Sequence, residues 1–324
     1  MRATQAFFEQ IGGPEVIQWR EVDLPAPGPG EVLLRQEAVG LNFIDTYFRT
    51  GLYPARLPSG MGMEAAGVIE AVGEGVTAFK PGDRAGYTGS PGAYATARLI
   101  KAAELLPVPD NVDSRIAAAV LLKGTTVEML AERCAPVAPG GWALVPAAAG
   151  GVGLLLVQWL KARGVRVIGT VGSPEKVAAA KEAGAEHVLL TDDADLVAKV
   201  REITEGAGVR VSYDGVGAAT WKASLKSVGR RGVIASFGNA SGPVTGVALR
   251  DLATNGSLYV TRPGVYDYYK DPTEAAAGAA KLWEMLAAGH INVTVGQTYA
   301  LTDAAQAHID LEARRTTGST LLLP

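Results

Sequence analysis

Residues 142–153, which read WALVPAAAGGVG, constrain the fold of this chain more than any other stretch. The apolar residues 143–145 predict a strand that is buried on both faces, as in a parallel sheet. Small residues follow, and the apolar run after them predicts a helix closed by Gly164. A strand, a small-residue turn and a helix together predict a dinucleotide site, because a helix N-terminus offers free N–H groups and a positive dipole end to a pyrophosphate.

The glycine pattern in this turn is A-x-G-x-x-G, because Ala148 stands where the usual fingerprint has its first glycine. Gly150 would let the backbone approach the phosphates, and Gly153 would let the helix pack closely against the strand. The pattern alone is also compatible with an empty turn in an α/β fold, but its position between strand and helix favours a cofactor. The residues that we assign to cofactor binding here are Gly150, Gly151, Val152 and Gly153.

Composition narrows the remaining classes. A chain of 324 residues is long for one core, so we expect two lobes. A formal net charge of −3 argues against electrostatic nucleic-acid binding, and no apolar run approaches the length of a membrane span. We find no secretory signal, and Cys134 is the only cysteine, which excludes an internal disulfide and fits a reducing, cytoplasmic location.

The pattern around the dinucleotide motif predicts two kinds of structure. Short strands and tight turns up to residue 99 predict a compact β lobe, in which residues 39–51 are too polar for a core helix. We expect helices at 114–122 and 125–133, and then strands and helices that alternate through residues 257–261. Six strands interleaved with helices predict a doubly wound parallel sheet, and the last strand, at 320–323, should rejoin the first lobe.

Eight stretches of the chain resemble the quinone oxidoreductases of the zeta-crystallin type, in the medium-chain dehydrogenase/reductase superfamily. They are GLNFIDTYFRTGLYP (40–54), LLKGTTV (121–127), AAAGGVG (147–153), GTVGSPEKV (169–177), YDGVG (213–217), SFGNASGPV (236–244), YVTRP (259–263) and ARRTTGS (313–319). The resemblance implies an α/β fold with a Rossmann domain at 123–262 and a mostly β, GroES-like catalytic domain at 1–122 with 263–324. It also implies NADPH, no metal and a homodimer.

The resemblance also suggests site residues. Near the nicotinamide it places Asn42, Phe43, Asp45, Thr46 and Thr126, and at the mouth of the substrate site Tyr47 and Tyr53. Against the rest of the cofactor it places Phe237, Gly238, Asn239, Arg262, Pro263 and Arg314. We take Asn42, Tyr47 and Tyr53 as catalytic. The alternatives are a polar loop that caps its own turns and tyrosines that only pack. Lys123 is compatible either with a position near the nicotinamide or with an ion pair between the two lobes.

The segment after the next strand predicts which nicotinamide cofactor is used. An NAD site places an acid about 20 residues beyond the glycines, and residues 169–173 hold none. Ser173 offers a hydroxyl and Lys176 a cation to a 2′-phosphate, although Lys176 is also compatible with a solvated helix position. Glu175 and Asp192 carry the opposing charge, so discrimination against NADH would be weaker than is usual in the family.

Zinc-dependent members of the superfamily carry a cysteine near position 42 and Gly-His-Glu near 62–64, where this chain has Asn42 and Gly62-Met63-Glu64. We therefore expect no metal and a hydride transfer from NADPH to a small-molecule quinone, without an essential side-chain acid. The alternatives are reduction of the activated C=C bond of an enal or enone, and a non-catalytic NADPH-binding protein. The apolar edge strand at 257–261 predicts a homodimer.

Overall fold

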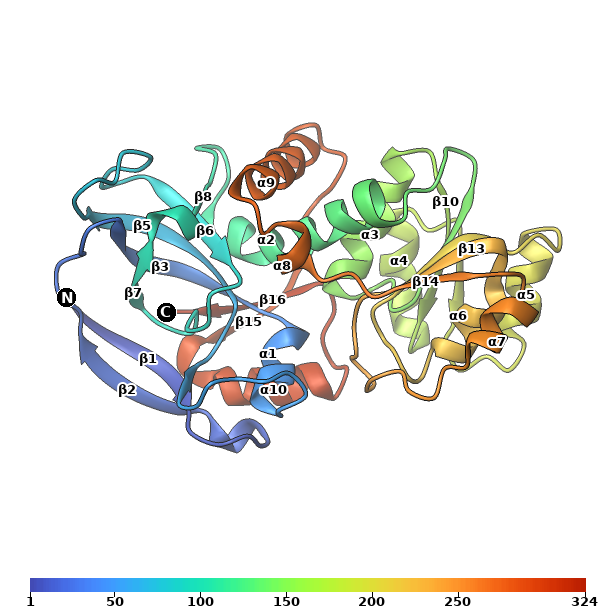
Figure 1. Cartoon of the computed structure of the whole chain (residues 1–324), viewed down its shortest axis with the longest axis horizontal. Coiled ribbons are helices and arrows are strands. Elements are labelled where there is room, and N and C mark those ends of the chain that lie inside the picture. The colour runs from blue at the N-terminus through green and yellow to red at the C-terminus, as the bar shows by residue number, and fades with distance from the viewer. The chain divides into compact units, whose positions relative to one another are not determined.

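The computed structural model describes residues 1–324 and divides them into two compact units (Figure 1). Unit 1 is Met1–Leu122 with Val293–Pro324, and unit 2 is Lys123–Asn292. The first boundary lies where we expected it, but the second lies at 292/293 and not at 262/263. Helix α9 (Pro272–Ala287) accounts for the difference, because its fully buried Leu282 fills the space left by Gly124, where an added Cβ would lie 2.5 Å from the leucine.

Unit 2 is built on a six-stranded sheet in which every pairing is parallel, in the order β11-β10-β9-β12-β13-β14. The strands are β9 (Trp142–Val145), β10 (Arg166–Val171), β11 (His187–Leu190), β12 (Val209–Asp214), β13 (Val228–Ser236) and β14 (Tyr259–Thr261). The doubly wound sheet is thus confirmed. Its order reverses between β9 and β12, which is where such sheets bind ligands.

Helices cover both faces of this sheet. In Figure 1, α3 and α4 lie on one side of the strands, and α5 and α6 lie on the other. The helices are α3 (Gly151–Ala162), α4 (Val177–Ala183), α5 (Leu196–Ile203), α6 (Trp221–Ser227), α7 (Leu249–Thr254) and α8 (Val265–Tyr268). The core between helices and sheet includes Leu144, Ile168 and Ile234, so the apolar strands predicted a buried sheet correctly.

The prediction of separate helices at 114–122 and 125–133 was wrong. One helix, α2 (Ser114–Glu128), runs through both segments and continues as a π-helical turn, Met129–Cys134. Gly124 lies inside this helix and does not end it. Its role is in packing, because the absence of a side chain there leaves room for Leu282 of α9. None of the helices combines the length and the apolar character that crossing a bilayer requires.

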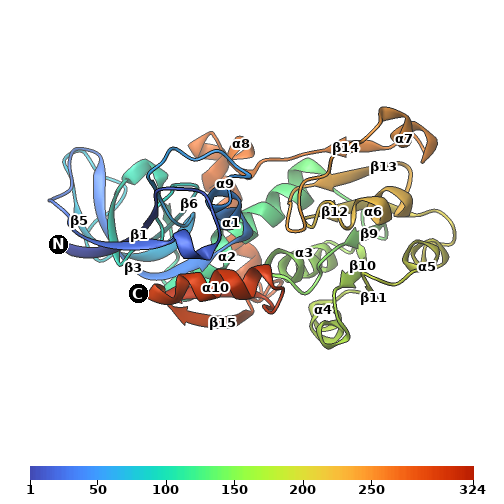
Figure 2. The ribbon, with the colours of Figure 1, turned by 90° about the horizontal axis from the view of Figure 1, so that it is seen from below.

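Unit 1 contains two sheets, one of seven strands and one ordered β2-β1-β4. The strands are β1 (Arg2–Phe8), β2 (Gln18–Asp23), β3 (Glu31–Leu41), β4 (Ser59–Gly60), β5 (Glu64–Val72), β6 (Arg84–Thr88), β7 (Ala97–Lys101), β8 (Leu106–Pro107), β15 (Val295–Ala300) and β16 (Ser319–Leu323). Leu321 of β16 pairs with Gly40 of β3, which confirms that the tail rejoins the first lobe. Figures 1 and 2 show these C-terminal elements beside the N-terminal strands.

Two helices of unit 1 differ from expectation. The stretch that we considered too polar for a core helix forms α1 (Phe43–Arg49), in which Asp45 and Arg49 are each only 1% exposed. Helix α10 (Ala304–Glu312), which we did not predict, packs near it and buries His308. The expectation failed because the polar groups of α1 find partners inside the fold.

Candidate functional site

The N-terminus of α1 holds the first residue that we assigned to catalysis. Asn42 is the N-cap residue, and its backbone N–H donates to Oδ2 of Asp45 at 2.9 Å. This reciprocal bond is one half of a capping box, with an aspartate in the place of the usual glutamate. The sequence Asn-x-x-Asp therefore fixes the backbone of Asn42 at the point where β3 turns into α1.

The side chain of Asn42 is held by a second carboxylate. Its Nδ2 donates to Oε2 of Glu64 at 2.7 Å and to the carbonyl of Gly40 at 3.3 Å. The other oxygen of Glu64 accepts the backbone N–H of Leu122 at 2.7 Å, and Glu64 is fully buried. We did not assign a role to Glu64 from the sequence. The available signal was an acid next to the apolar start of β5, where a buried charge needs partners.

Tyr47 and Tyr53 lie together beside this segment. Their ring centroids are 5.2 Å apart with one edge toward the other face, and the N–H of Tyr53 donates to the carbonyl of Tyr47 at 2.9 Å. Phe43 lies 6.4 Å from the ring of Tyr47. One short segment of unit 1 thus brings together the three residues that we assigned to catalysis. Thr46 donates within the same helix, to the carbonyl of Phe43 at 2.7 Å.

A cavity of about 340 Å³ lies in unit 1 next to α1. Apolar side chains dominate its lining, and Asp45 and Arg56 supply its charged groups. Tyr47 and Tyr53 are not among the lining residues. The apolar lining consists of Phe8, Phe48, Pro54, Ala55, Pro58, Met61, Met63 and Pro91. Such a wall of rings and thioethers suits a planar apolar molecule.

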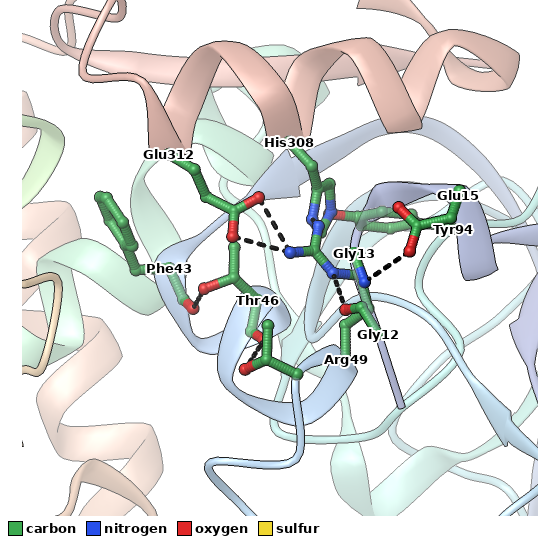
Figure 3. A network of polar contacts seen from close by, with 10 residues as sticks. Gly12, Gly13, Glu15, Phe43, Thr46, Arg49, Tyr94, His308 and Glu312 are labelled. Atoms are coloured by element: carbon green, nitrogen blue, oxygen red, sulfur yellow. Dashed lines mark hydrogen bonds and ion pairs between the residues drawn. The ribbon is translucent and has the colours of Figure 1, made fainter. Parts of the chain in front are cut away.

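A buried polar chain leads from Asp45 to the surface, and Figure 3 shows the part of it that Tyr94, His308, Arg49 and Glu312 form. Tyr94 donates its hydroxyl to Oδ2 of Asp45 at 3.0 Å and contacts Nε2 of His308 at 2.9 Å. Nδ1 of His308 lies 2.8 Å from Nη1 of Arg49, whose Nη2 binds both oxygens of Glu312 at 2.7 and 2.8 Å. Burial, followed by the nearby guanidinium, lowers the pKa of His308 to about 3, so this imidazole is neutral.

In unit 2 the predicted dinucleotide turn has the geometry that a pyrophosphate needs. Gly150 is the N-cap of α3 and makes no side-chain cap bond, so no N-cap side chain occupies the N–H groups of the first turn. A Cβ on Gly153 would lie 2.2 Å from the carbonyl oxygen of Ala147, so only glycine fits. Ala147 itself has a left-handed φ of 54°. These features fit a dinucleotide phosphate at the start of α3.

The loop after β12 is organised by Asp214, which we did not assign from the sequence. Its Oδ1 accepts the backbone N–H groups of Val216 and Gly217 at 2.9 and 3.0 Å. Thr220 and Ser224 donate their hydroxyls to Oδ2 at 2.8 and 2.7 Å. A buried carboxylate with this many donors is well compensated and holds the loop at the edge of the sheet where ligands bind.

The loop after β13 lies against this one. A Cβ on Gly238 would lie 2.1 Å from the carbonyl oxygen of Gly215, so the two backbones approach as closely as glycine allows. Arg262, directly after β14, donates Nη1 to the carbonyls of Ser236 and Gly238 at 2.7 and 3.3 Å. The structure therefore uses Arg262 to brace this loop. The remaining predicted residues, Phe237, Asn239 and Pro263, directly follow the same two strands.

The predicted 2′-phosphate residues lie after β10. Ser173 precedes a 3₁₀ turn, Pro174–Lys176, and a hydrogen bond from its side chain lowers the pKa of Glu175. The hydroxyl is therefore already used by the neighbouring acid, while Lys176 is half-buried. Thr126 is half-buried in α2, and Arg314 follows α10 with a left-handed φ of 59°.

The residues at the zinc positions of the superfamily do not fit zinc. An amide, Asn42, and a thioether, Met63, replace the cysteine and histidine, and both oxygens of Glu64 already accept hydrogen bonds. Zinc in proteins is held by thiolate, imidazole and carboxylate groups. We therefore derive no chemical step through a metal.

Comparison with known proteins agrees with this arrangement. The model for the alcohol dehydrogenase GroES-like domain matches residues 28–110, and the model for zinc-binding dehydrogenases matches residues 151–303. A quinone oxidoreductase of Pseudomonas aeruginosa is 49% identical over 98% of both chains. A 2-haloacrylate reductase of a Burkholderia species is 40% identical, also over 98% of both chains.

A solved structure gives the same result. The crystal structure of Escherichia coli quinone oxidoreductase complexed with NADPH superposes with a TM-score of 0.96 at 46% identity, over 99% of this chain and 100% of that one. A likeness of this extent covers both units, the glycine turn and the segment around Asn42. The chain belongs to the quinone oxidoreductases of the medium-chain dehydrogenase/reductase superfamily.

Proposed function

We propose that this protein is a zinc-independent NADPH:quinone reductase. The observation that carries the proposal is the full-length likeness to quinone oxidoreductases, one of which is solved as its NADPH complex. The glycine turn at the start of α3 supports the cofactor, because only glycine fits at position 153 and the helix N-terminus has no side-chain cap. Bound NADPH would supply the hydride, and the protein would supply orientation.

The side chains of the site divide this work between them. The N–H groups of α3 would hold the pyrophosphate, and the loop braced by Arg262 would lie against the cofactor through Gly238 and Asn239. Asn42, fixed by Asp45 and Glu64, would orient the nicotinamide end, assisted by Phe43, Thr46, Thr126 and Arg314. Tyr47 and Tyr53 would hold the carbonyl of the quinone, while water protonates the quinol oxygen.

One alternative has an observation in its favour. Reduction of an activated C=C bond is the chemistry named for the 2-haloacrylate reductase relative, and Arg56 at the apolar cavity is a cation that a substrate carboxylate would attract. We prefer the quinone, because the relatives named quinone oxidoreductases are more similar to this chain than the 2-haloacrylate reductase is.

Steady-state kinetics with one quinone, one enone and 2-chloroacrylate distinguish these functions. We expect turnover of 1,4-benzoquinone with NADPH that survives a chelator. Tyr47→Phe and Tyr53→Phe should each lower kcat/KM by about 10- to 100-fold, the value of one strong hydrogen bond. Loss of about 10⁴-fold would identify a proton donor and favour the C=C reductase. No turnover of any acceptor would leave a non-catalytic NADPH-binding protein.

The proposal includes a homodimer formed through the edge strand β14. Tyr259 and Val260 of this strand are 62% and 40% exposed, and the nearby Leu249 is 82% exposed. An apolar sheet edge left open promotes aggregation, and a two-fold partner would cover it. Light scattering at micromolar concentration tests this, and a monomer would contradict it. A cytoplasmic location is also part of the proposal, supported by the single cysteine.

A further inference from the structure

The buried chain from Arg49 to Asp45 has only one possible hydrogen-bond direction. Arginine can only donate, so Nδ1 of His308, 2.8 Å from Nη1 of Arg49, must accept. A neutral imidazole with an accepting Nδ1 carries its proton on Nε2 and donates it to the oxygen of Tyr94. The hydroxyl proton of Tyr94 is then directed to Oδ2 of Asp45, as its 3.0 Å bond requires.

The far end of this chain is anchored firmly. Nη2 of Arg49 binds both oxygens of Glu312, and Nε of the same guanidinium donates to the carbonyl of Gly12 at 3.2 Å. His308 and Glu312 are four residues apart, so they lie one above the other on the same face of α10. Arg49, held by Glu312 and Gly12, therefore fixes both the position of the imidazole and its Nε2–H tautomer.

The near end of the chain reaches a residue of the proposed site. Oδ2 of Asp45 accepts both the hydroxyl of Tyr94 and the backbone N–H of Asn42. The carboxylate is thus shared between the network and the N-cap of α1, and it also lines the cavity of unit 1. Burial raises the pKa of Tyr94 well above its usual value, so the hydroxyl keeps the proton that it donates.

We propose that His308, acting through Tyr94, is a positioning residue that sets the carboxylate of Asp45 and thereby the place of Asn42 for hydride transfer. The proposal rests on the proposed function, because Asn42 is taken to orient the nicotinamide. His308 is fully buried and does not line the cavity of unit 1, so its role would be exerted through Tyr94 and Asp45. Its contribution is to fix one hydrogen-bond direction through a buried core.

Two substitutions of His308 separate the hydrogen bond of its Nδ1 to Arg49 from that of its Nε2 to Tyr94. His308→Asn keeps an acceptor near Nδ1 for Arg49 but cannot reach Tyr94, whereas His308→Gln keeps a donor near Nε2. Tyr94→Phe breaks the same link from the other side. Tyr87→Phe is the matched control, since Tyr87 is equally buried in unit 1 and its hydroxyl donates to Gln36 at 2.8 Å, away from α1.

We expect His308→Asn and Tyr94→Phe each to lower kcat for benzoquinone by about 10- to 150-fold, the value of one hydrogen bond to a charged group. KM for NADPH should stay within about threefold, because unit 2 would make most contacts with the cofactor. The double variant should have a kcat no lower than that of the less active single variant, since both substitutions break the same hydrogen bond between His308 and Tyr94. His308→Gln and Tyr87→Phe should stay within about threefold of the parent.

A readout without cofactor or acceptor completes the test. In ¹⁵N NMR spectra of the unliganded protein, the ring nitrogens of His308 should report a neutral Nε2–H tautomer from pH 5 to 9. The backbone amide signal of Asn42 should shift in Tyr94→Phe and His308→Asn but not in Tyr87→Phe. If the parent reduces no quinone, the function fails while this amide shift still tests the positioning.

Three results would overturn the positioning role. The first is an active parent whose kcat changes less than twofold in both Tyr94→Phe and His308→Asn. The second is a double variant whose loss is the product of the two single losses, which would show independent effects. The third is an Nδ1–H tautomer of His308, or an unshifted Asn42 amide in both variants.

Discussion

Each unit holds one buried aspartate beside its proposed part of the site, and the two are stabilised in opposite ways. Asp214 of unit 2 draws its donors from residues that are two to ten positions away. The chain around Asp45 of unit 1 depends on bonds between residues that are 214, 259 and 263 positions apart. One network is complete within residues 214–224, which run from the end of β12 into α6, and the other exists only after the two ends of the chain have met.

This difference teaches what each network can do. A local network such as that of Asp214 shapes its own loop and forms when the loop folds. A network of distant residues such as that of Arg49 joins α1 to α10. Its loss should therefore lower the stability of unit 1 and also displace Asn42. We therefore expect substitutions in the Arg49 network to have the wider effects.

The largest effect should come from Arg49→Met. The guanidinium is buried, and its removal leaves His308 and the carbonyl of Gly12 without their donor and Glu312 without its partner. We expect a loss of about 3–5 kcal/mol in the free energy of unfolding, measured by urea denaturation. The matched control is Arg315→Met, whose more exposed ion pair with Asp310 should cost under about 1 kcal/mol. Equal losses would remove the distinction between the networks.

Asp214→Asn should have the next largest effect. If the amide oxygen replaces Oδ1 and keeps the backbone N–H groups, the amide N–H₂ faces the hydroxyls of Thr220 and Ser224, so these two hydroxyls lose the charged acceptor that Oδ2 now provides. We expect a loss of about 2–3 kcal/mol in unfolding free energy. NADPH affinity, followed by fluorescence, should fall as well, with quinone KM unchanged. Asp193→Asn, which alters an exposed turn of the same unit, is the control. Weakened quinone binding with unchanged NADPH affinity would contradict a local role.

The pH dependence of stability tests the buried imidazole. Burial and Arg49 lower the pKa of His308 from 6.5 in the unfolded chain to about 3 in the fold; Tyr94 contacts its Nε2, and Glu312 pairs with the same Arg49. Above pH 6.5 the imidazole is neutral in both states, so the free energy of unfolding is at its full value. It falls as pH drops from 6.5 toward 3, because over this range only the unfolded chain protonates the imidazole. The slope approaches about 1.4 kcal/mol per pH unit.

His308→Gln lacks this proton uptake and isolates the contribution of the imidazole. The difference in unfolding free energy between the parent and the variant should therefore shrink between pH 6.5 and 4.5, measured by urea denaturation at four pH values. A difference that stays constant over this range would show that the imidazole binds its proton equally well in both states.

The smallest effect should come from Lys176→Ala in unit 2. Lys176 is half-buried after β10, and Glu175 beside it weakens the local positive field. We expect KM for NADPH to rise about 5- to 10-fold and KM for NADH to change little, because only NADPH carries the 2′-phosphate. Lys181→Ala, in the helix α4 that directly follows Lys176, should change neither value. Equal effects of Lys176→Ala on both cofactors would show that the lysine does not read the phosphate.

The sequence by itself determined most of unit 2. Apolar strands, a small-residue turn and alternating helices are local patterns, and they sufficed to predict the parallel sheet, the glycine turn at Gly153 and the edge strand β14. We chose the segment that carries Asn42, Tyr47 and Tyr53 because its residues resemble those of a known family, and their roles in catalysis stay a prediction.

Only the tertiary structure decided how polar residues are buried. Nothing local shows that Arg49 enters a core, that α10 brings His308 to Tyr94, or that Glu64 holds Asn42. The packing of α9 was also not visible in the sequence. Its Leu282 fits against α2 only because Gly124 has no side chain, and α9 therefore belongs to unit 2, which ends at residue 292. A charge can be buried only beside its partner. The partners of Arg49 and Tyr94 lie more than 200 positions away, so periodicity and propensity carry no information about them, and only the folded chain brings each pair together.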